Sequence, residues 1–229
     1  MFMSRTIVIV GNGTMPAFAA SAIDDGDLVI RFNDCRSYGS AGTRTDVVAV
    51  CNTGRPARAM IGGTAWKTHP AVRAAASLWC VRDGGKFRAL RGKLAESHPD
   101  LGDFCDDLTA GFADFAAETG KAFSSIPRRY HDRLDADLSR FGAEGYVVPS
   151  SGLLTIAYVL GEIARPQDTV RLAGFDHRGW DGHPFDAEQR LVETLVCGGR
   201  LSRLSPPAQR LFSASARTLP GSRRQRRLP

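Results

Sequence analysis

TIVIVGNG, the sequence of residues 6–13, decides the fold class of this chain. A run of five apolar or β-branched residues is typical of a strand that is buried on both faces of a parallel sheet. The glycines at positions 11 and 13 then close the strand with a tight turn. Because parallel neighbours need a crossover connection, usually a helix, this stretch predicts the first strand of a βαβ unit.

The residues that follow continue this pattern. We expect an alanine-rich helix over residues 15–23 and two more buried strands over residues 28–32 and 45–51. The connections between these segments are short, as they are in βαβ units. The sequence therefore predicts an α/β fold, a single Rossmann-like domain with a mostly parallel central sheet flanked by helices.

The rest of the chain is expected to complete this domain. Further strands are predicted over residues 77–81 and 169–173, and helices over residues 105–119, 128–140, 153–164 and 183–196. From residue 206 onward the chain is rich in Ser, Pro and Arg and has no hydrophobic periodicity. We therefore expect one domain over residues 1–205 and a flexible, Arg-rich tail over residues 206–229.

The formal net charge of +6 arises at the C-terminal end. Eight arginines and no acidic residue lie after residue 199, whereas the preceding part has a small excess of acids. A nucleic-acid-binding domain would carry its excess positive charge on the folded part. We therefore expect no specific nucleic-acid partner, and we expect that deletion of residues 206–229 leaves folding intact.

No segment of the chain reads as an export signal or a membrane span. The apolar run at residues 6–10 is much shorter than the apolar region of a secretory signal, and no stretch approaches the 18 or so apolar residues that a span needs. The five cysteines form no C-x-x-C pair, which favours reduced, mostly packed thiols over a structural zinc site. These features predict a cytoplasmic protein, and the excess of Arg over Lys hints at a bacterial source.

One candidate phosphate site is the turn Gly11-Asn12-Gly13. Glycines there allow a ligand to approach the backbone closely, ahead of an expected helix. The dinucleotide fingerprint needs a third glycine where this chain has Pro16, although Asp34 lies where a ribose-binding carboxylate would lie. A phosphate site and an ordinary strand-to-helix turn are therefore equally consistent with this turn alone.

A second candidate is the turn Ser150-Ser151-Gly152, which precedes a predicted helix. A serine in this place commonly caps a helix by accepting a hydrogen bond from a backbone N–H group. The same geometry offers hydroxyls and unpaired N–H groups to a phosphate. Two such turns in one α/β domain favour a nucleotide-binding cradle more than either turn does alone.

A third candidate is the polar stretch 176–183, which contains His177 and His183 and is followed by Glu188. Two histidines and several acids close together could bind a metal, but a spacing of six residues is not a standard helical ligand pair. A histidine at a helix start is more often a cap or a surface residue. Asp25 and Asp27 precede a strand, at the wrong end of a parallel sheet for a ligand, so we interpret them as a solvated turn. We expect no metal site.

Three segments resemble the sialyl motifs of glycosyltransferase family 29, and they occur in the same order. Residues 8–48, with VGNG at 10–13, DLVIRFN at 27–33 and GTRT at 42–45, look like the long motif. PSSGLLT at 149–155, running on to LAGF at 172–175, resembles the short motif, and HPFDAE at 183–188 has the His-x4-Glu spacing of the very short motif. Bacterial proteins similar to this chain carry the label urease operon accessory protein, which refers to gene neighbourhood and not to mechanism.

The resemblance implies a sialyltransferase-type fold and a CMP-activated sugar donor, typically CMP-sialic acid. It also implies inverting transfer that needs no metal or other cofactor. Carried over by position, the residues that would hold the nucleotide's phosphate, ribose and cytidine are Asn12, Asn33, Ser150, Ser151, Gly152, Gly174 and Phe175. His183 would be the base that takes the proton of the acceptor hydroxyl, and Glu188 would support the local fold.

The chain also departs from this family's pattern. The cysteines that link the long and short motifs in animal enzymes are absent, in agreement with a reducing compartment. The family's third motif, a His-Tyr pair, is shortened here to residues 176–182, where His177 is a candidate phosphate contact. The chain is also short, which leaves little room for an elaborate acceptor site.

Two main hypotheses follow from the sequence. The first is a sialyltransferase-like enzyme that transfers a sugar from a CMP-activated donor to a glycan or small-molecule acceptor. The second is a non-catalytic, nucleotide-binding accessory protein that keeps the CMP cradle. A NAD-dependent oxidoreductase is a third hypothesis, which Pro16 disfavours.

Overall fold

The computed structural model describes residues 3–204, so the expected tail and the boundary at residue 205 lie outside the described residues. Seven strands form one sheet in the order β5-β4-β3-β2-β1-β6-β7, and each pairing is parallel. Their bounds are β1 Thr6–Val10, β2 Leu28–Phe32, β3 Val47–Val50, β4 Ser77–Cys80, β5 Ala122–Ser125, β6 Thr169–Ala173 and β7 Ser202–Arg203. The predicted α/β fold is confirmed, with a sheet that is parallel throughout.

β1 lies inside the sheet because both of its faces are apolar. Ile7 and Ile9 belong to the core on one side of the sheet, and Val8 and Val10 to the core on the other. β1 pairs with β2 along one edge and with β6 along the other. The chain runs outward from β1 to β5 and then returns to add β6, so the direction of strand addition switches between β1 and β6. In open parallel sheets, ligands bind at the carboxyl ends of the strands at such a point.

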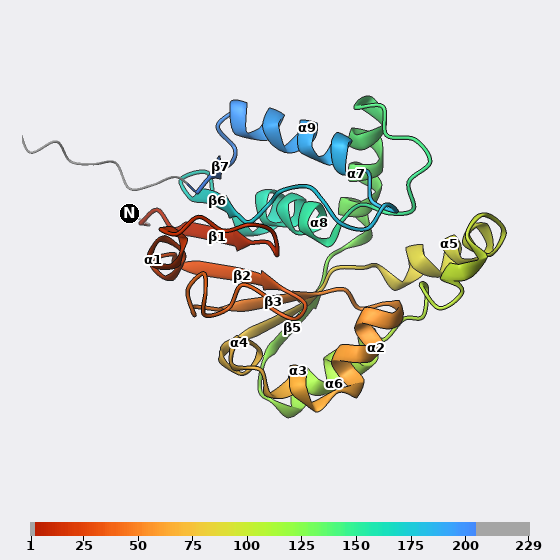
Figure 1. Ribbon diagram of the computed structural model, residues 1–229, viewed down its shortest axis with the longest axis horizontal. Coiled ribbons are helices and arrows are strands. Elements are labelled where there is room, and N and C mark those ends of the chain that lie inside the picture. The colour runs from red at the N-terminus through yellow and green to blue at the C-terminus, as the bar shows by residue number, and fades with distance from the viewer. Residues whose placement is uncertain (1–2, 205–229) are drawn as a thin grey trace, which may run out of the picture.

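Helices cover both faces of the sheet. One face is covered by α7 (Arg128–Arg140), α8 (Ser151–Tyr158) and α9 (Phe185–Cys197), which share the largest apolar core. The other face is covered by α1 (Ala19–Asp24), α2 (Gly54–Gly62), α3 (Thr64–Thr68), α4 (Pro70–Ala74) and α6 (Thr109–Glu118). Figure 1 shows α7, α8 and α9 above the sheet and α2, α3 and α6 below it.

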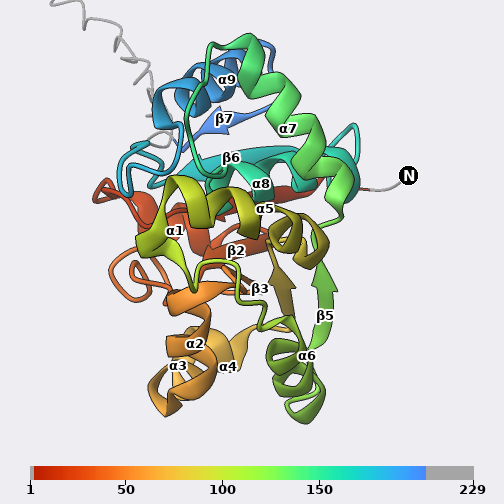
Figure 2. The same cartoon turned by 90° about the vertical axis from the view of Figure 1, so that its right-hand side faces the viewer.

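A further helix, α5 (Gly84–Ser97), lies at the carboxyl edge of the sheet. Phe87 and Leu94 of this helix pack with Cys105 and Val148 in a small core of their own, next to a 3₁₀ turn at Pro99–Leu101. In Figure 2, which views the molecule from this side, α5 lies in front of the strands. The carboxyl edge is therefore enclosed by chain segments from both halves of the sequence.

Several predicted elements match the structure, and others differ for local reasons. The strands expected at 6–10, 28–32 and 169–173 and the helix at 128–140 have the expected bounds. The helix expected at 15–23 begins only at Ala19, and the one expected at 153–164 begins at Ser151 and ends in a π-helical turn over Val159–Ile163. The edge strand β5 was not predicted because it is mostly exposed and carries no apolar alternation.

Two further sequence expectations concern membranes and thiols. None of the described helices combines the length and apolar character that a bilayer crossing requires. All five cysteines lie in the described part of the chain as free thiols. Four of them are buried, and Cys197 is exposed.

Candidate functional site

Two adjoining cavities open at the carboxyl edge of the sheet. We call the first the glycine cavity, with a volume of about 540 Å³, because the turns at Gly11 and Gly174 line it. We call the second the arginine cavity, with a volume of about 370 Å³, because Arg55 and Arg82 line it. The side chains common to both walls are Asn33, Ser151, Trp180 and His183. A ligand that fills both cavities would therefore pass these four side chains.

The glycine turn after β1 packs directly against the turn after β6. The N–H groups of Gly11 and Gly13 donate to the carbonyl oxygens of Ala173 and Gly174 at 2.8 and 2.9 Å. A Cβ atom at Gly11 would lie 2.3 Å from the Gly174 oxygen, so only glycine allows this approach. Because α1 begins only at Ala19, the turn does not present a helix N-terminus to the cavity. Two of the amides that the sequence suggested for a phosphate are thus engaged within the fold.

Asn12 and Phe175 also line the glycine cavity. Asn12 is exposed at the tip of the turn after β1. Phe175 follows β6 and contacts the ring of Phe32 edge-on, with centroids 6.2 Å apart. A Cβ atom at Gly152 would lie 2.8 Å from the Phe175 ring, so this glycine lets the start of α8 approach the end of β6. The residues expected around a nucleotide therefore come together from four segments of the chain.

The start of α8 is held by a buried carboxylate. Ser150 is the N-cap, and its hydroxyl oxygen accepts a hydrogen bond from the Leu153 N–H group at 3.1 Å. The Ser150 hydroxyl and N–H groups donate to the two carboxylate oxygens of Glu188, each at 2.6 Å. Glu188 is 1% exposed, and burial raises its pKa, while the bonds from Ser150 oppose that shift. The polar groups of Ser150 are therefore committed to the fold, and Glu188 anchors α9 to α8.

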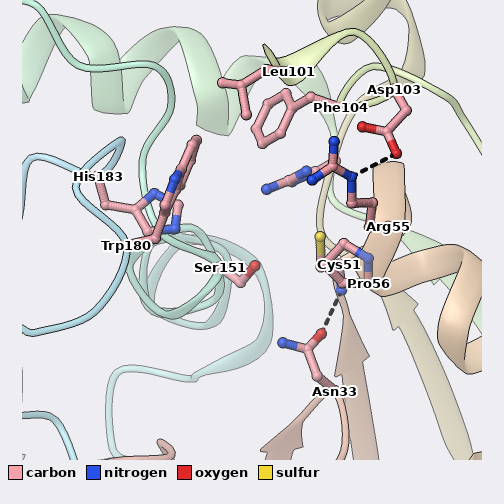
Figure 3. A pocket seen from close by; sticks show the side chains of 11 residues that line it. Asn33, Cys51, Arg55, Pro56, Leu101, Asp103, Phe104, Ser151, Trp180 and His183 are labelled. Atoms are coloured by element: carbon pink, nitrogen blue, oxygen red, sulfur yellow. Dashed lines mark hydrogen bonds and ion pairs between the residues drawn. The ribbon is translucent and has the colours of Figure 1, made fainter.

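Ser151 and Gly152 begin the helix and face the site. Their N–H groups belong to the first turn of α8, where an intrahelical acceptor does not exist. Neither N–H group, nor the Ser151 hydroxyl, has a hydrogen-bond partner within residues 3–204. Figure 3 shows the Ser151 side chain between the His183 side and the Arg55 side of the arginine cavity. The start of α8 thus offers two amides and a hydroxyl where the cavities meet.

Asn33 presents an amide group to both cavities. Its backbone has a φ of +50°, a left-handed conformation that asparagine tolerates better than most residues. Its Oδ1 accepts the Cys51 N–H group at 2.8 Å, and its carbonyl oxygen accepts the Trp66 indole N–H group at 2.8 Å. Because Oδ1 faces Cys51, the Nδ2 group is left toward the cavities, as Figure 3 illustrates. Asn33 is therefore oriented to donate a hydrogen bond to a ligand.

His183 lies at the junction of the two cavities in a defined tautomer. Its Nδ1 atom lies 2.8 Å from the carbonyl oxygen of Val148, which can only accept, so Nδ1 carries the proton. Nε2 then carries a lone pair and has no hydrogen-bond partner in the described part of the chain. Burial lowers the pKa of His183, and the nearby Arg82 charge lowers it further, against the effect of the Val148 bond. The ring is therefore a neutral base near pH 7.

Residues 176–183 form an outer wall of the site. Trp180 is 40% exposed, and its ring meets that of His183 at right angles with centroids 5.0 Å apart. His177 has a φ of +49°, and its buried Nε2 atom has no hydrogen-bond partner among the described residues. Burial lowers the pKa of His177. This histidine lines the glycine cavity but not the arginine cavity.

The carboxylates considered as metal ligands lie at the amino end of β1. Asp25 and Asp27 are exposed, and Asp27 accepts the Thr6 N–H group at 2.7 Å, at the amino end of β1. They therefore lie at the opposite end of the sheet from the cavities, in the place expected for a solvated turn. Within residues 3–204, no group of three or more His, Cys, Asp or Glu side chains is placed to hold a metal ion.

Sequence reasoning missed the side chains that build the arginine cavity. Arg82 directly follows the strand predicted at 77–81, and Asn52 follows the one predicted at 45–51. Polar residues at the carboxyl ends of predicted parallel strands were the signal that could have identified them. Arg55 lies in the first turn of α2, Leu101 ends the 3₁₀ turn and Phe104 follows it; the sequence predicted neither element, and only the folded chain brings these residues to the site.

Comparisons with known proteins concern the fold and the family separately. No protein-family profile matches the chain. The chain resembles a crystal structure of a mammalian sialyltransferase with a TM-score of 0.52, over 88% of this chain and 69% of that one. The two sequences are 14% identical, so this likeness concerns the fold. It agrees with the Rossmann-like, sialyltransferase-type fold expected from the sequence.

A much closer sequence relationship exists with a bacterial protein. The "Urease operon 23 kDa accessory protein" of Rhizobium meliloti (strain 1021) is 56% identical over 206 residues. The aligned residues cover 90% of this chain and 95% of that protein. Identity of this extent means that the chain belongs to the family of the urease operon 23 kDa accessory protein.

Proposed function

We propose that this protein is a sialyltransferase-like glycosyltransferase that moves a sugar from a CMP-activated donor to an acceptor hydroxyl. The observation that carries the proposal is His183, whose Nδ1–H group donates to Val148 while its Nε2 atom, at the junction of the two cavities, has no partner in the part of the chain that the structure describes. A histidine in this tautomer can accept a proton from a hydroxyl group. The sialyltransferase-type fold supports the assignment of a nucleotide-sugar donor.

The glycine cavity would hold the CMP part of the donor. The leaving phosphate carries growing negative charge, which fixed hydrogen-bond donors stabilise. The N–H groups of Ser151 and Gly152 and the Nδ2 group of Asn33 are the donors we assign to that role. Asn12, Gly174, Phe175 and His177 also line this cavity. Ser150 and Glu188 would act indirectly, because their polar groups bind each other and hold the start of α8.

The reaction would be a single inverting displacement. Nε2 of His183 takes the proton of the acceptor hydroxyl as its oxygen forms a bond to the anomeric carbon of the donor. The bond between that carbon and the phosphate oxygen breaks, and its electron pair leaves with CMP. The proton on His183 is then released to solvent. The mechanism uses no metal, so we expect undiminished turnover in EDTA.

Calorimetry and donor hydrolysis test this proposal in turn. We expect CMP to bind more tightly than NAD, and we expect the protein to hydrolyse at least one CMP-sugar in a donor screen. Binding of NAD without CMP would contradict the nucleotide assignment. Binding of CMP without hydrolysis or transfer of any CMP-sugar would instead favour a non-catalytic accessory protein.

A matched variant isolates the base. In His183→Asn the Nδ2 group can still donate to the Val148 carbonyl, but no atom replaces the Nε2 lone pair. We expect at least 100-fold slower turnover with CMP affinity unchanged, since general base catalysis typically contributes about 10²–10⁴-fold. Equal turnover in wild type and His183→Asn would remove His183 from the mechanism.

The pH dependence provides an independent check. Because burial lowers the pKa of His183, its base form persists below the usual imidazole value of about 6.5. Turnover should therefore stay constant as the pH falls to about 6.5 and decline only at lower pH. A decline centred above that value would show that another group is being titrated.

A further inference from the structure

Arg82 is a buried cation whose position is fixed by the fold. It is 7% exposed and directly follows β4. Its backbone N–H group donates to Asn52 Oδ1 at 2.8 Å, and its carbonyl oxygen accepts the Asn52 Nδ2 group at 3.0 Å. Its Nη1 group donates to the Thr53 hydroxyl at 2.5 Å. Three hydrogen bonds therefore hold both ends of this residue.

Two aromatic rings enclose the guanidinium group of Arg82. Its central carbon lies 4.9 Å from the ring centre of Phe87 and 4.4 Å from that of Phe104. The two rings are stacked on each other, with their centroids 5.7 Å apart. Aromatic rings contact the flat face of a guanidinium group, and its N–H groups point outward along its edge. A hydrogen-bonding partner therefore has to approach from that edge.

No carboxylate neutralises Arg82 within residues 3–204. It takes part in none of the ion pairs there, and burial lowers the pKa of its guanidinium group. Asp103, the acid in the wall of the same cavity, is paired with Arg55 at 3.1 Å. Two arginines and one aspartate thus give the lining a formal charge of +1. Buried charges are normally paired, so the unpaired state of Arg82 indicates an anionic ligand.

We infer that the arginine cavity is a subsite for a substrate carboxylate, which Arg82 holds through the edge of its guanidinium group. A planar carboxylate can accept two parallel hydrogen bonds from an arginine, and its single negative charge balances the formal +1 charge of the lining. Leu101, Phe104 and Trp180 supply apolar contacts beside the charge, as a sugar or small organic acid requires. The volume of about 370 Å³ suits a ligand of that size.

The carboxylate would belong to a molecule that reacts at His183. Arg82 and His183 line the same cavity, and His183 also lines the glycine cavity. Figure 3 shows His183 and Trp180 facing Phe104 and Arg55 across the arginine cavity. A carboxylate on the transferred sugar and one on the acceptor would share this chemistry, and the experiment separates them. The assignment of the bound molecule as a substrate rests on the proposed function.

Calorimetry with paired probes tests the subsite without relying on catalysis. The probes are N-acetylneuraminate and glucuronate, each compared with its uncharged methyl ester. Wild type should bind at least one acid at least tenfold more tightly than its ester, and Arg82→Met should remove that difference. Arg128→Gln removes an equal charge from an exposed pair on α7 and should behave as wild type. Equal binding of acid and ester by wild type would overturn the inference, whether or not Arg82→Met folds.

Nucleotide probes identify the source of the carboxylate. If it belongs to the donor, Arg82→Met should weaken CMP-N-acetylneuraminate at least tenfold while the CMP affinity is unchanged. If it belongs to the acceptor, Arg82→Met should weaken glucuronate measured in the presence of CMP and leave CMP-N-acetylneuraminate unchanged. An equal loss of CMP and carboxylate binding would mark Arg82 as a structural residue and overturn the inference. Acid-selective binding that depends on Arg82, in a protein that binds no CMP, would support the subsite and contradict the proposed function.

Arg82→Lys tests whether the geometry of the guanidinium group matters in addition to its positive charge. Lysine keeps a cation near the cavity but cannot form two parallel hydrogen bonds with one carboxylate. We expect the preference of Arg82→Lys for the acid over the ester to lie between the preferences of wild type and Arg82→Met. Urea unfolding checks that each variant is folded. Selectivity in Arg82→Lys that equals the wild-type value would contradict edge-on recognition by the guanidinium group.

Discussion

At the junction of the two cavities, two side chains each use one polar atom for a hydrogen bond within the fold and present another to the cavities. Asn33 gives Oδ1 to the Cys51 N–H group and keeps Nδ2 toward the cavities. His183 gives Nδ1–H to the Val148 carbonyl and keeps the Nε2 lone pair. A side chain held by one atom loses less rotamer freedom when its other atom meets a ligand. Both residues are therefore oriented before a substrate binds.

Glu188 acts at the same scale, although it lines neither cavity. In Glu188→Ala, the Ser150 N–H and hydroxyl groups would lose both of their carboxylate acceptors. Because buried donors without partners are costly, we expect the free energy of unfolding to fall by about 1–3 kcal/mol. We also expect weaker CMP binding, since the start of α8 would no longer be held. Urea unfolding and calorimetry measure the two effects.

Two further variants control for charge and shape. Glu188→Gln keeps one acceptor oxygen and should lose less stability than Glu188→Ala. Glu96→Gln removes a carboxylate from the exposed surface of α5 and should change the free energy of unfolding by less than about 0.5 kcal/mol. Glu188→Ala with wild-type stability would show that Ser150 does not depend on this carboxylate.

At the scale of elements, the site depends on how closely the ends of β1 and β6 approach. The two strands are paired from Thr6 to Val10, and the hydrogen bonds continue into the glycine turns beyond them. The glycines in these turns therefore have a packing role, in addition to the ligand role that the sequence suggested. The start of α8 approaches the same place because Gly152 lies against Phe175.

Gly11→Ala tests this packing. Its Cβ atom would lie 2.3 Å from the Gly174 oxygen and 3.2 Å from the Phe175 ring, so the two turns would have to separate. We expect a loss of about 1–3 kcal/mol in the free energy of unfolding, as for other overpacked sites, and weaker CMP binding. Urea unfolding measures the first effect and calorimetry the second.

The same substitution elsewhere provides the control. Gly92 lies within α5, and a Cβ atom there would meet no described residue within 4 Å. Gly92→Ala should therefore raise the free energy of unfolding by about 0.5–1 kcal/mol, because alanine is the better helix former. Similar effects of Gly11→Ala and Gly92→Ala would refute the close approach of the β1 and β6 turns.

At the scale of the whole molecule, ion pairs connect α5, at the carboxyl edge of the sheet, to α7, which covers one face of the sheet. Lys86 of α5 pairs with Asp132 at 3.0 Å and with Asp135, both on α7. His131 lies beside this cluster and is 1% exposed, and no residue from 3 to 204 offers a hydrogen-bond partner to its buried Nε2 atom. Burial, and then the Lys86 charge, lower the pKa of His131 to about 4, although Asp83, Asp132 and Asp135 oppose the shift.

His131 should make the whole molecule sensitive to acid. Between pH 6.5 and about 4, the unfolded chain binds a proton at this histidine and the folded chain does not. The free energy of unfolding should therefore fall as the pH falls through this window, by roughly 3 kcal/mol from this residue at its lower end. His131→Leu lacks the titrating group, and carboxylates that titrate in both proteins cancel in the comparison. Urea unfolding of both from pH 7 to pH 4 measures the difference, and a constant difference would refute the assignment.

The sequence by itself determined the sheet elements and much of the glycine cavity. Buried β-branched runs such as 6–10 and 28–32 have few alternatives to a parallel strand, and the residues after such strands must meet at one edge. The resemblance to the sialyl motifs predicted site roles for Asn33, Ser151 and His183, and the structure brings these residues together. The helices α2–α4 are short and bury few large apolar side chains, and the strand β5 is mostly exposed, so the sequence did not predict them.

Only the tertiary structure decided which polar atoms remain available to a ligand. Ser150 and Ser151 are adjacent in the sequence, but Glu188 takes the polar groups of the first and leaves those of the second. The carboxylates near Arg82 in the sequence, such as Asp83, could have paired with it, yet Asp83 caps α5 instead. Hydrogen-bond partners of this kind come from residues far apart in the chain, as with Asn52 and Arg82. Composition and local periodicity contain no record of such pairings, because they exist only once the strands and helices have packed.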